Sequence, residues 1–154
     1  MPAPVSNAEA QDVKVRAAVY DGAIEHGVPP LVDDVARRVS LPPAAVRESL
    51  ERLAGGRALV LQPESREVLM ANPFSAVPTP FAVRANDRLY YGNCIWDALG
   101  IPALLRCDAR IECSCGCCGE AMTLEVHGET LSGGQGTVHF AIPAHRWWQD
   151  IVYN

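Results

Sequence analysis

Residues 88–104 read RLYYGNCIWDALGIPAL, and this stretch is predicted to place a strand directly before a helix. Arg88–Gly92 is expected to be a strand or an extended entry. Asn93 is a good helix N-cap, because its side-chain oxygen can accept a hydrogen bond from a free N–H of the first turn. The helix is expected over Asn93–Gly100, since Gly100 and Pro102 disfavour a longer helix.

A thiol and a carboxyl group fall together at the start of this helix. With Asn93 as the cap, Cys94 enters the first turn, where the helix dipole favours a negative sulfur and lowers the thiol pKa. Asp97 follows three residues later on the same face. Sulfur prefers soft metals, and a carboxylic acid beside a thiolate-bound metal–carbon bond can protonate the carbon. On spacing alone, a buried cysteine near a surface aspartate is the favoured interpretation.

Further strands are predicted on the C-terminal side of this pair. Ala109–Glu112 and Met122–His127 are expected to be strands that flank a segment of cysteines and glycines. Thr137–Ile142 is predicted to be another strand, and a helix is expected to begin within Pro143–Asn154. Together with the 88–104 stretch, these elements indicate a small mixed-strand module over residues 83–154.

The N-terminal part has an element order typical of a winged helix-turn-helix. The predicted elements are helices over 9–26, Val32–Val39 and Pro43–Ala54, followed by β-type runs over Ala58–Leu61 and Glu67–Met70. Residues 72–82 contain three prolines, which is typical of a semi-rigid linker. The predicted fold is therefore α+β, with a winged-helix-like module over 1–71, a linker over 72–82 and the second module over 83–154.

All six cysteines fall within 25 residues of the second module. Four of them are packed into six residues, namely Cys113, Cys115, Cys117 and Cys118. Gly116 and Gly119 allow the tight turn that such a loop needs. Four ligands from one short loop are crowded around a tetrahedral zinc, so a soft ion of lower coordination number, such as copper(I) or mercury(II), fits better. An exposed loop without a specific metal is the alternative.

Charge and hydropathy narrow the classes of function. The net charge is −5, and a recognition helix over 43–54 with Arg47 and Arg52 against Glu48 and Glu51 is formally neutral. Phosphate binding requires an excess of positive charge on the contacting face, so DNA is the disfavoured partner. We expect no membrane-spanning helix and no secretion signal. These expectations predict a cytoplasmic protein, in which clustered cysteines indicate metal or thiol chemistry rather than disulfides.

The stretch from Tyr91 to Leu104 resembles the signature of the organomercurial (alkylmercury) lyase family. Its pattern is Tyr, two residues, Cys94, two residues, Asp97, one residue, Leu, two residues and Pro-Ala-Leu. The likeness covers residues 88–127, and Cys115 falls where members of the family carry a cysteine. The resemblance implies that Cys94 is the first of two mercury-binding cysteines. It also implies that Asp97 mediates proton transfer to the leaving carbon, without a cofactor.

The sequence departs from the family pattern at the second mercury-binding cysteine. Counting without a gap from Arg146 places Asp150 at that position, and no cysteine follows Cys118. Three functions therefore compete. The first is cleavage of a carbon–mercury bond by Cys94 and Asp97, with Asp150 or another thiol as co-ligand. The second is non-catalytic binding of a soft metal (mercury, copper(I) or zinc) by the 113–118 loop. The third is a metal-responsive DNA-binding regulator.

The first two functions imply the same kinds of partner. The ligand is an organomercurial or a soft metal ion, and a small thiol or another thiol protein accepts the metal afterwards. Whether the chain is an enzyme depends on which function holds, because a thiol that only stores mercury performs no bond cleavage.

Overall fold

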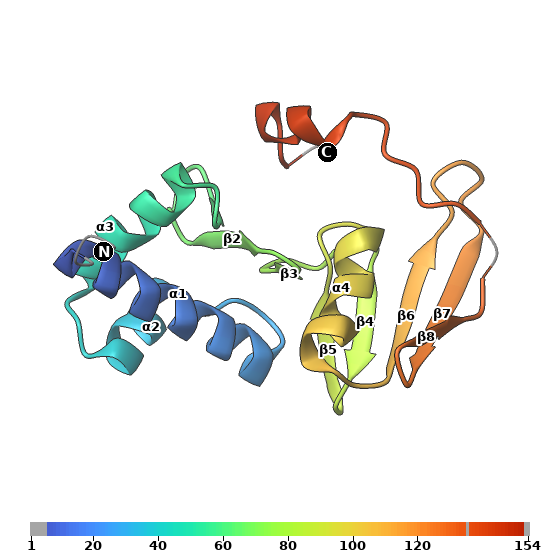
Figure 1. Cartoon of the computed structure of the whole chain (residues 1–154), viewed down its shortest axis with the longest axis horizontal. Helices are drawn as coiled ribbons and strands as arrows, with labels where there is room; N and C mark the ends of the chain where they lie inside the picture. Colours follow the sequence, from blue (N-terminus) through green and yellow to red (C-terminus); the bar gives the residue numbers. More distant parts are fainter. Residues whose placement is uncertain (1–5, 135, 153–154) are drawn as a thin grey trace, which may run out of the picture.

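The computed structural model describes residues 6–134 and 136–152, which form an α+β fold with two hydrophobic cores. Figure 1 shows three helices at one end of the molecule and a larger antiparallel sheet at the other. The expected α+β class is confirmed.

Three helices build the N-terminal half. They are α1 (Asn7–His26), α2 (Val32–Val39) and α3 (Pro43–Gly55). Ser6 caps α1 in a reciprocal pair with Glu9, and Gly27 ends it with φ of 85°, a conformation that favours glycine. The helices enclose the first core, whose fully buried members include Val15, Val19, Val46 and Leu50. The three predicted helices are thus confirmed, with bounds that differ by at most two residues.

A small antiparallel sheet follows the helices in the order β1–β2–β3. Its strands are β1 (Val60–Leu61), β2 (Val68–Ala71) and β3 (Phe74–Ser75). The first two strands form the predicted hairpin. The third strand lies inside the proline-containing segment 72–82, and sequence patterning did not predict it. It pairs with β2 and also forms a single bridge from Phe74 to Gly92.

The second sheet is entirely antiparallel and has the order β5–β4–β6–β7–β8. Its strands are β4 (Ala82–Ala85), β5 (Arg88–Tyr91), β6 (Ala109–Ser114), β7 (Ala121–His127) and β8 (Thr130–Ser132). Helix α4 (Ile95–Leu105) connects β5 to β6 and packs against β4 and β6. This packing encloses the second core, in which Val83, Ile101 and Ile111 are fully buried.

The two halves share buried residues and hydrogen bonds. Phe74 is fully buried between Tyr20 of α1 and Tyr90 of β5, with ring centroids 6.4 and 5.6 Å away. The Tyr90 hydroxyl donates to the carbonyl of Ile24 (3.0 Å), and the Tyr20 hydroxyl donates to the carbonyl of Asn72 (2.9 Å). Helix α1 therefore belongs to both cores and fixes the position of the second sheet.

The predicted end of the central helix at Gly100 is wrong. Helix α4 runs through Gly100 and Pro102 to Leu105. Its buried face, formed by Ala98, Ile101 and Pro102, packs into the second core, and tertiary packing outweighs the poor helix propensity of glycine and proline.

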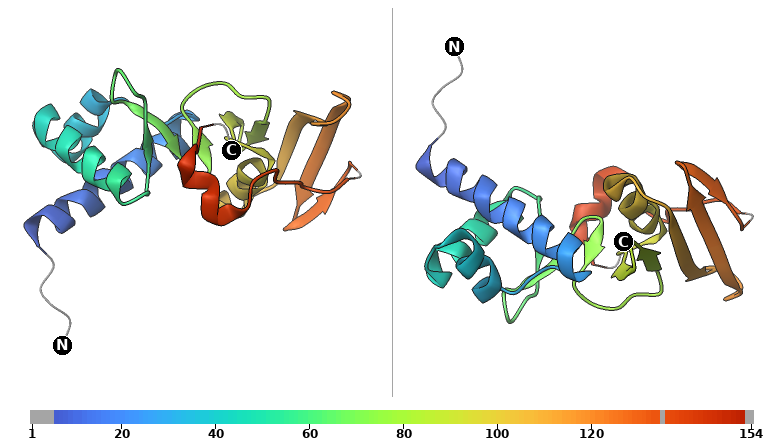
Figure 2. Two further views of the ribbon diagram at one scale, coloured as in Figure 1. Left: turned by 90° about the horizontal axis from the view of Figure 1, so that it is seen from above. Right: turned by 90° about the horizontal axis from the view of Figure 1, so that it is seen from below.

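The predicted strand over Thr137–Ile142 is also wrong. Gly133 and Gly134 adopt φ of 74° and 70° directly after β8, and the chain then leaves the sheet. It runs back toward the N-terminal half and ends in a short 3₁₀ helix, η1 (Ala144–Gln149) (Figures 1 and 2). Within residues 6–134 and 136–152, no helix is both long and apolar enough to cross a membrane.

Candidate functional site

Cys94 lies at the junction between β5 and α4. It is itself the N-cap of α4, with an extended backbone (φ of −146°), and the helix begins at Ile95. Gly92 makes this tight entry possible, because an added Cβ would lie only 2.5 Å from the amide nitrogen of Ala98 and 3.0 Å from the Cys94 carbonyl oxygen. The prediction that Asn93 caps the helix is therefore wrong by one residue.

The Asn93 side chain holds Asp97 instead of capping the helix. Its Nδ2 donates to Oδ2 of Asp97 at 2.9 Å and to Oδ1 of Asn72 at 3.1 Å. Its own Oδ1 is buried and accepts no hydrogen bond from the described residues. Asn72 links this network to α1 through its carbonyl, which accepts the Tyr20 hydroxyl. Sequence reasoning gave Asn93 only a capping role and did not identify it as a partner of Asp97.

Burial dominates the electrostatics of the Cys94–Asp97 pair. It raises the pKa of the Asp97 carboxyl above its ordinary value, against the opposing effect of the Asn93 hydrogen bond. Burial likewise raises the pKa of the Cys94 thiol, although the backbone N–H groups of Asp97 and Trp96 favour the thiolate. The expected lowering of the Cys94 pKa is therefore wrong, because the loss of hydration raises this pKa more than the N–H groups at the helix start lower it.

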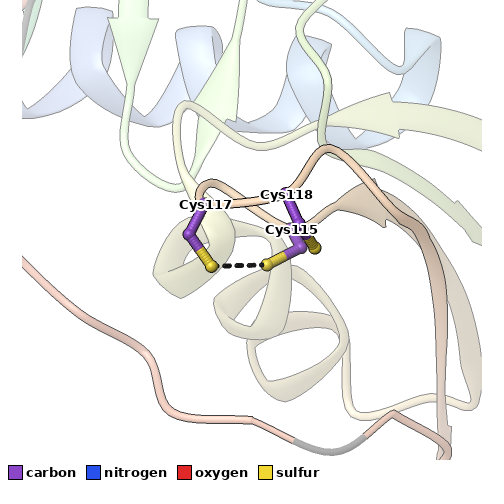
Figure 3. Close-up of side chains that lie close together, drawn as sticks. All are labelled: Cys115, Cys117 and Cys118. Atoms are coloured by element: carbon purple, nitrogen blue, oxygen red, sulfur yellow. Dashed lines mark hydrogen bonds between the residues drawn. The ribbon is translucent and has the colours of Figure 1, made fainter.

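Three of the cysteines come together in the turn between β6 and β7. The sulfur atoms of Cys115, Cys117 and Cys118 lie within 4.8 Å of one another, and those of Cys115 and Cys117 are 3.3 Å apart (Figure 3). Cys113 is a half-buried residue of β6, opposite Met122, and lies outside this group. Hydrogen bonds from the backbone of Cys117 and then Cys118 lower the pKa of the Cys115 thiol to about 7.

The Cys94 junction and this cysteine turn lie at the same end of the second sheet. Strands β5 and β6 both run antiparallel to β4, and Ala82 is the partner of Tyr91 on one side and of Glu112 on the other. Adjacent strands lie about 4.8 Å apart, so the ends of β5 and β6 are separated by about 10 Å. The fold thus places Cys94 and the cysteine turn, whose nearest members are 21 residues apart in the sequence, at one end of the sheet.

The C-terminal segment contacts the first turn of α4. The Phe140 ring lies 6.4 Å from the Trp96 ring and 4.9 Å from the Trp147 ring. The Arg57 guanidinium of the N-terminal half lies 5.8 Å from the centroid of the Trp148 ring. Asp150 is exposed and forms the C-cap of η1. These contacts place Phe140 of the C-terminal segment beside Trp96, a residue of the first turn of α4.

Comparisons with known proteins identify the family of this chain. The model of the alkylmercury lyase family (MerB) matches residues 74–153, which is 80 of the 154 residues. The chain belongs to the alkylmercury lyase family. The match includes the Cys94–Asp97 pair, the cysteine turn and Asp150, so every candidate site residue of this family member falls within it. A search of curated proteins finds no match.

Among solved structures, this alkylmercury lyase family member resembles the crystal structure of the mercury-bound form of MerB2. The TM-score is 0.63 at 18% sequence identity, over 80% of this chain and 59% of that one. At this identity the likeness shows a shared fold. The chain spans little more than half the length of that relative.

We predict that Cys115 is the fastest cysteine to be alkylated near neutral pH. With a pKa of about 7, half of its thiol is ionised there, whereas Cys94 is mostly protonated. Since nucleophilicity falls with pKa (Brønsted β of about 0.4–0.5), the advantage should be several-fold. Iodoacetamide labelling followed by peptide mass spectrometry from pH 6 to 9 measures it, with half-buried Cys113 as the slow reference. Earlier labelling of Cys94 than of Cys115 would contradict this order.

Proposed function

We propose that this chain binds organomercurials through Cys94 and protonates the departing carbon through Asp97. The observation that carries the proposal is the half-buried thiol–carboxyl pair within the segment matched by the alkylmercury lyase model. The Cys94 sulfur is a soft donor that suits mercury. The carboxyl group of Asp97, whose pKa is raised by burial, keeps a proton to higher pH than an exposed aspartate.

The reaction has two steps in this proposal. The Cys94 thiol first gives up its proton with the ligand opposite the carbon, which leaves as its acid, and the sulfur takes that place, so that mercury joins the organic group to sulfur. The mercury–carbon bond then breaks as its electron pair takes the proton of Asp97 and forms a carbon–hydrogen bond. The aspartate becomes a carboxylate, and mercury stays on sulfur as a cation until small thiolates remove it. Asn93 stabilises the new carboxylate with its hydrogen bond.

Asp150 is proposed as the second mercury ligand, in place of a second cysteine. The contact between Phe140 and Trp96 supports this assignment, because it brings the C-terminal segment to the first turn of α4. A carboxylate is a harder ligand than a thiolate and donates less electron density to mercury. Cleavage of the carbon–mercury bond is therefore expected to be slow in the natural protein.

The test is benzene release from phenylmercury in the presence of excess small thiol. We expect slow release by the natural protein and at least about a tenfold faster rate for Asp150→Cys, since one metal-site ligand typically changes affinity or activity 10–100-fold. Glu129→Cys places an exposed thiol on another turn and serves as the matched control. Release at the same rate in all three proteins would reject Asp150 as the second ligand, and absence of release from all three would reject the lyase proposal.

We propose that the N-terminal part is a winged-helix module, followed by the 72–82 linker, that supports the second sheet instead of binding DNA. Three arginines of its third helix and hairpin pair with acidic neighbours. Arg52 pairs with Asp12 (2.7 Å), Arg47 with Glu67 (3.5 Å) and Arg66 with Glu51. These pairs neutralise the face that would have to meet phosphates, which disfavours a DNA-binding regulator.

A further inference from the structure

We propose that Cys115, Cys117 and Cys118 form a three-sulfur binding site for a soft cation, with mercury(II) as its test ion. Throughout, this group is called the cysteine turn. It is separate from the Cys94–Asp97 pair, and its metal binding does not depend on carbon–mercury cleavage. Nothing in the proposed lyase reaction uses these three thiols.

The backbone of the cysteine turn is held in place before any ion arrives. Strands β6 and β7 pair up to Ser114 and Ala121. The Cys115 N–H then donates to the Glu120 carbonyl, and the Gly119 N–H donates to the Cys115 carbonyl, each at 2.8 Å. Gly119 adopts φ of 72°, which a residue with a side chain rarely does. This closed turn directs the three side chains toward one another (Figure 3). The backbone therefore needs little further ordering when a metal binds.

The spacing of the sulfur atoms suits three-coordinate binding. A metal–sulfur bond of about 2.3 Å requires sulfur atoms about 4 Å apart around one ion. The three sulfurs lie within 4.8 Å of one another, and the closest pair is 3.3 Å apart. Small side-chain rotations therefore reach the required geometry without a change in the backbone.

The three sulfur ligands favour a soft metal ion. All three ligands are sulfur, and among the described residues no histidine or carboxylate joins the group. Magnesium and calcium prefer oxygen ligands, and structural zinc prefers four ligands. Soft thiophilic ions accept an all-sulfur site with fewer ligands. Because Cys117 and Cys118 are exposed, a small thiol can reach a bound ion and exchange with it.

The site differs from the grouping expected from sequence, which included Cys113. That residue is opposite Met122 in the β6–β7 register, two residues before the turn. The pairing with β7 fixes Cys113 within the strand, and its sulfur lies outside the group of three. Cys113 therefore provides a matched control, since it is a half-buried cysteine on the same hairpin.

The experiment measures mercury(II) binding under competition by a small monothiol, using the full chain with Cys94→Ser. Native mass spectrometry gives the stoichiometry, and ultraviolet thiolate-to-mercury absorption gives the coordination. We expect one mercury ion with the absorption of three-sulfur coordination. Replacing all three turn cysteines with serine should lower the affinity at least about tenfold, as loss of even supporting groups weakens metal sites 10–100-fold. Cys113→Ser should change the affinity less than twofold.

Single substitutions keep the test decisive if the triple variant fails to fold, which circular dichroism would reveal. Cys117→Ser and Cys118→Ser, at exposed positions, should each convert the absorption from three-sulfur to two-sulfur coordination. Unchanged affinity and absorption in these variants, or a loss with Cys113→Ser equal to that of the triple variant, would overturn the proposal. Addition of Asp97→Asn should leave mercury(II) binding unchanged, which separates this site from the lyase reaction.

Discussion

Replacing Asp97 with asparagine is expected to lower benzene release from phenylmercury by about 100-fold or more, because a positioned general acid typically contributes 10²–10⁴-fold. The substitution keeps the shape of the side chain and an oxygen that accepts the Asn93 hydrogen bond, but it removes the proton. Binding of phenylmercury at Cys94 should persist, since the thiol is untouched. Single-turnover release, measured by gas chromatography of benzene, separates the chemical step from binding.

Two matched variants control this experiment. Asp87→Asn makes the same chemical change at an exposed turn residue with φ of 58°, a conformation that asparagine tolerates, and should release benzene at the natural rate. Cys94→Ser should abolish release even though the cysteine turn still binds phenylmercury. Benzene release by Asp97→Asn at the rate of the natural protein would show that the proton comes from another donor and would reject the proposed role of Asp97.

The pH dependence of release follows from the direction of the Asp97 pKa shift. Burial raises this pKa, so the protonated acid persists to higher pH than in an exposed aspartate. Once phenylmercury is bound, the rate of its single-turnover cleavage should fall as the pH rises through the raised pKa. This decline should disappear in Asp97→Asn, which has no carboxyl group to titrate.

Replacing Phe74 with alanine is expected to lower the free energy of unfolding by about 3–5 kcal/mol, the usual loss for a buried phenylalanine. The side chain is fully buried and packs between Tyr20 and Tyr90, which belong to different halves. Its backbone also bridges to Gly92, two residues before Cys94. The cavity that this substitution leaves should therefore weaken both the contact between the two halves and the start of α4.

Urea unfolding followed by circular dichroism measures this loss. Leu131→Ala is the matched control, because its side chain is half exposed on β8, where substitutions usually change stability by about 0.5 kcal/mol. A loss below about 1 kcal/mol in Phe74→Ala, comparable with the control, would mean that the two halves do not depend on this contact.

Local sequence patterns predicted the elements whose signals lie within a few residues. The apolar spacing of α1, α2 and α3, together with Gly27 and Pro43 at their ends, was sufficient because helix periodicity and capping act over short distances. The strands β6 and β7 were also predicted. The two-residue strand β3 was missed, since its pairing with β2 and Gly92 comes from contacts made across the chain.

The sequence by itself determined the chemistry available to this protein: a thiol and a carboxyl group three residues apart, and four further thiols within six residues. Only the tertiary structure decided their environment. Burial raises the Cys94 pKa, although the helix start favours the thiolate. The Asn93 side chain donates a hydrogen bond to Asp97 instead of capping the helix. The β6–β7 register places Cys113 outside the cysteine turn. Hydration loss and strand pairing depend on neighbours that are distant in the chain, so they cannot be predicted from the spacing of nearby residues.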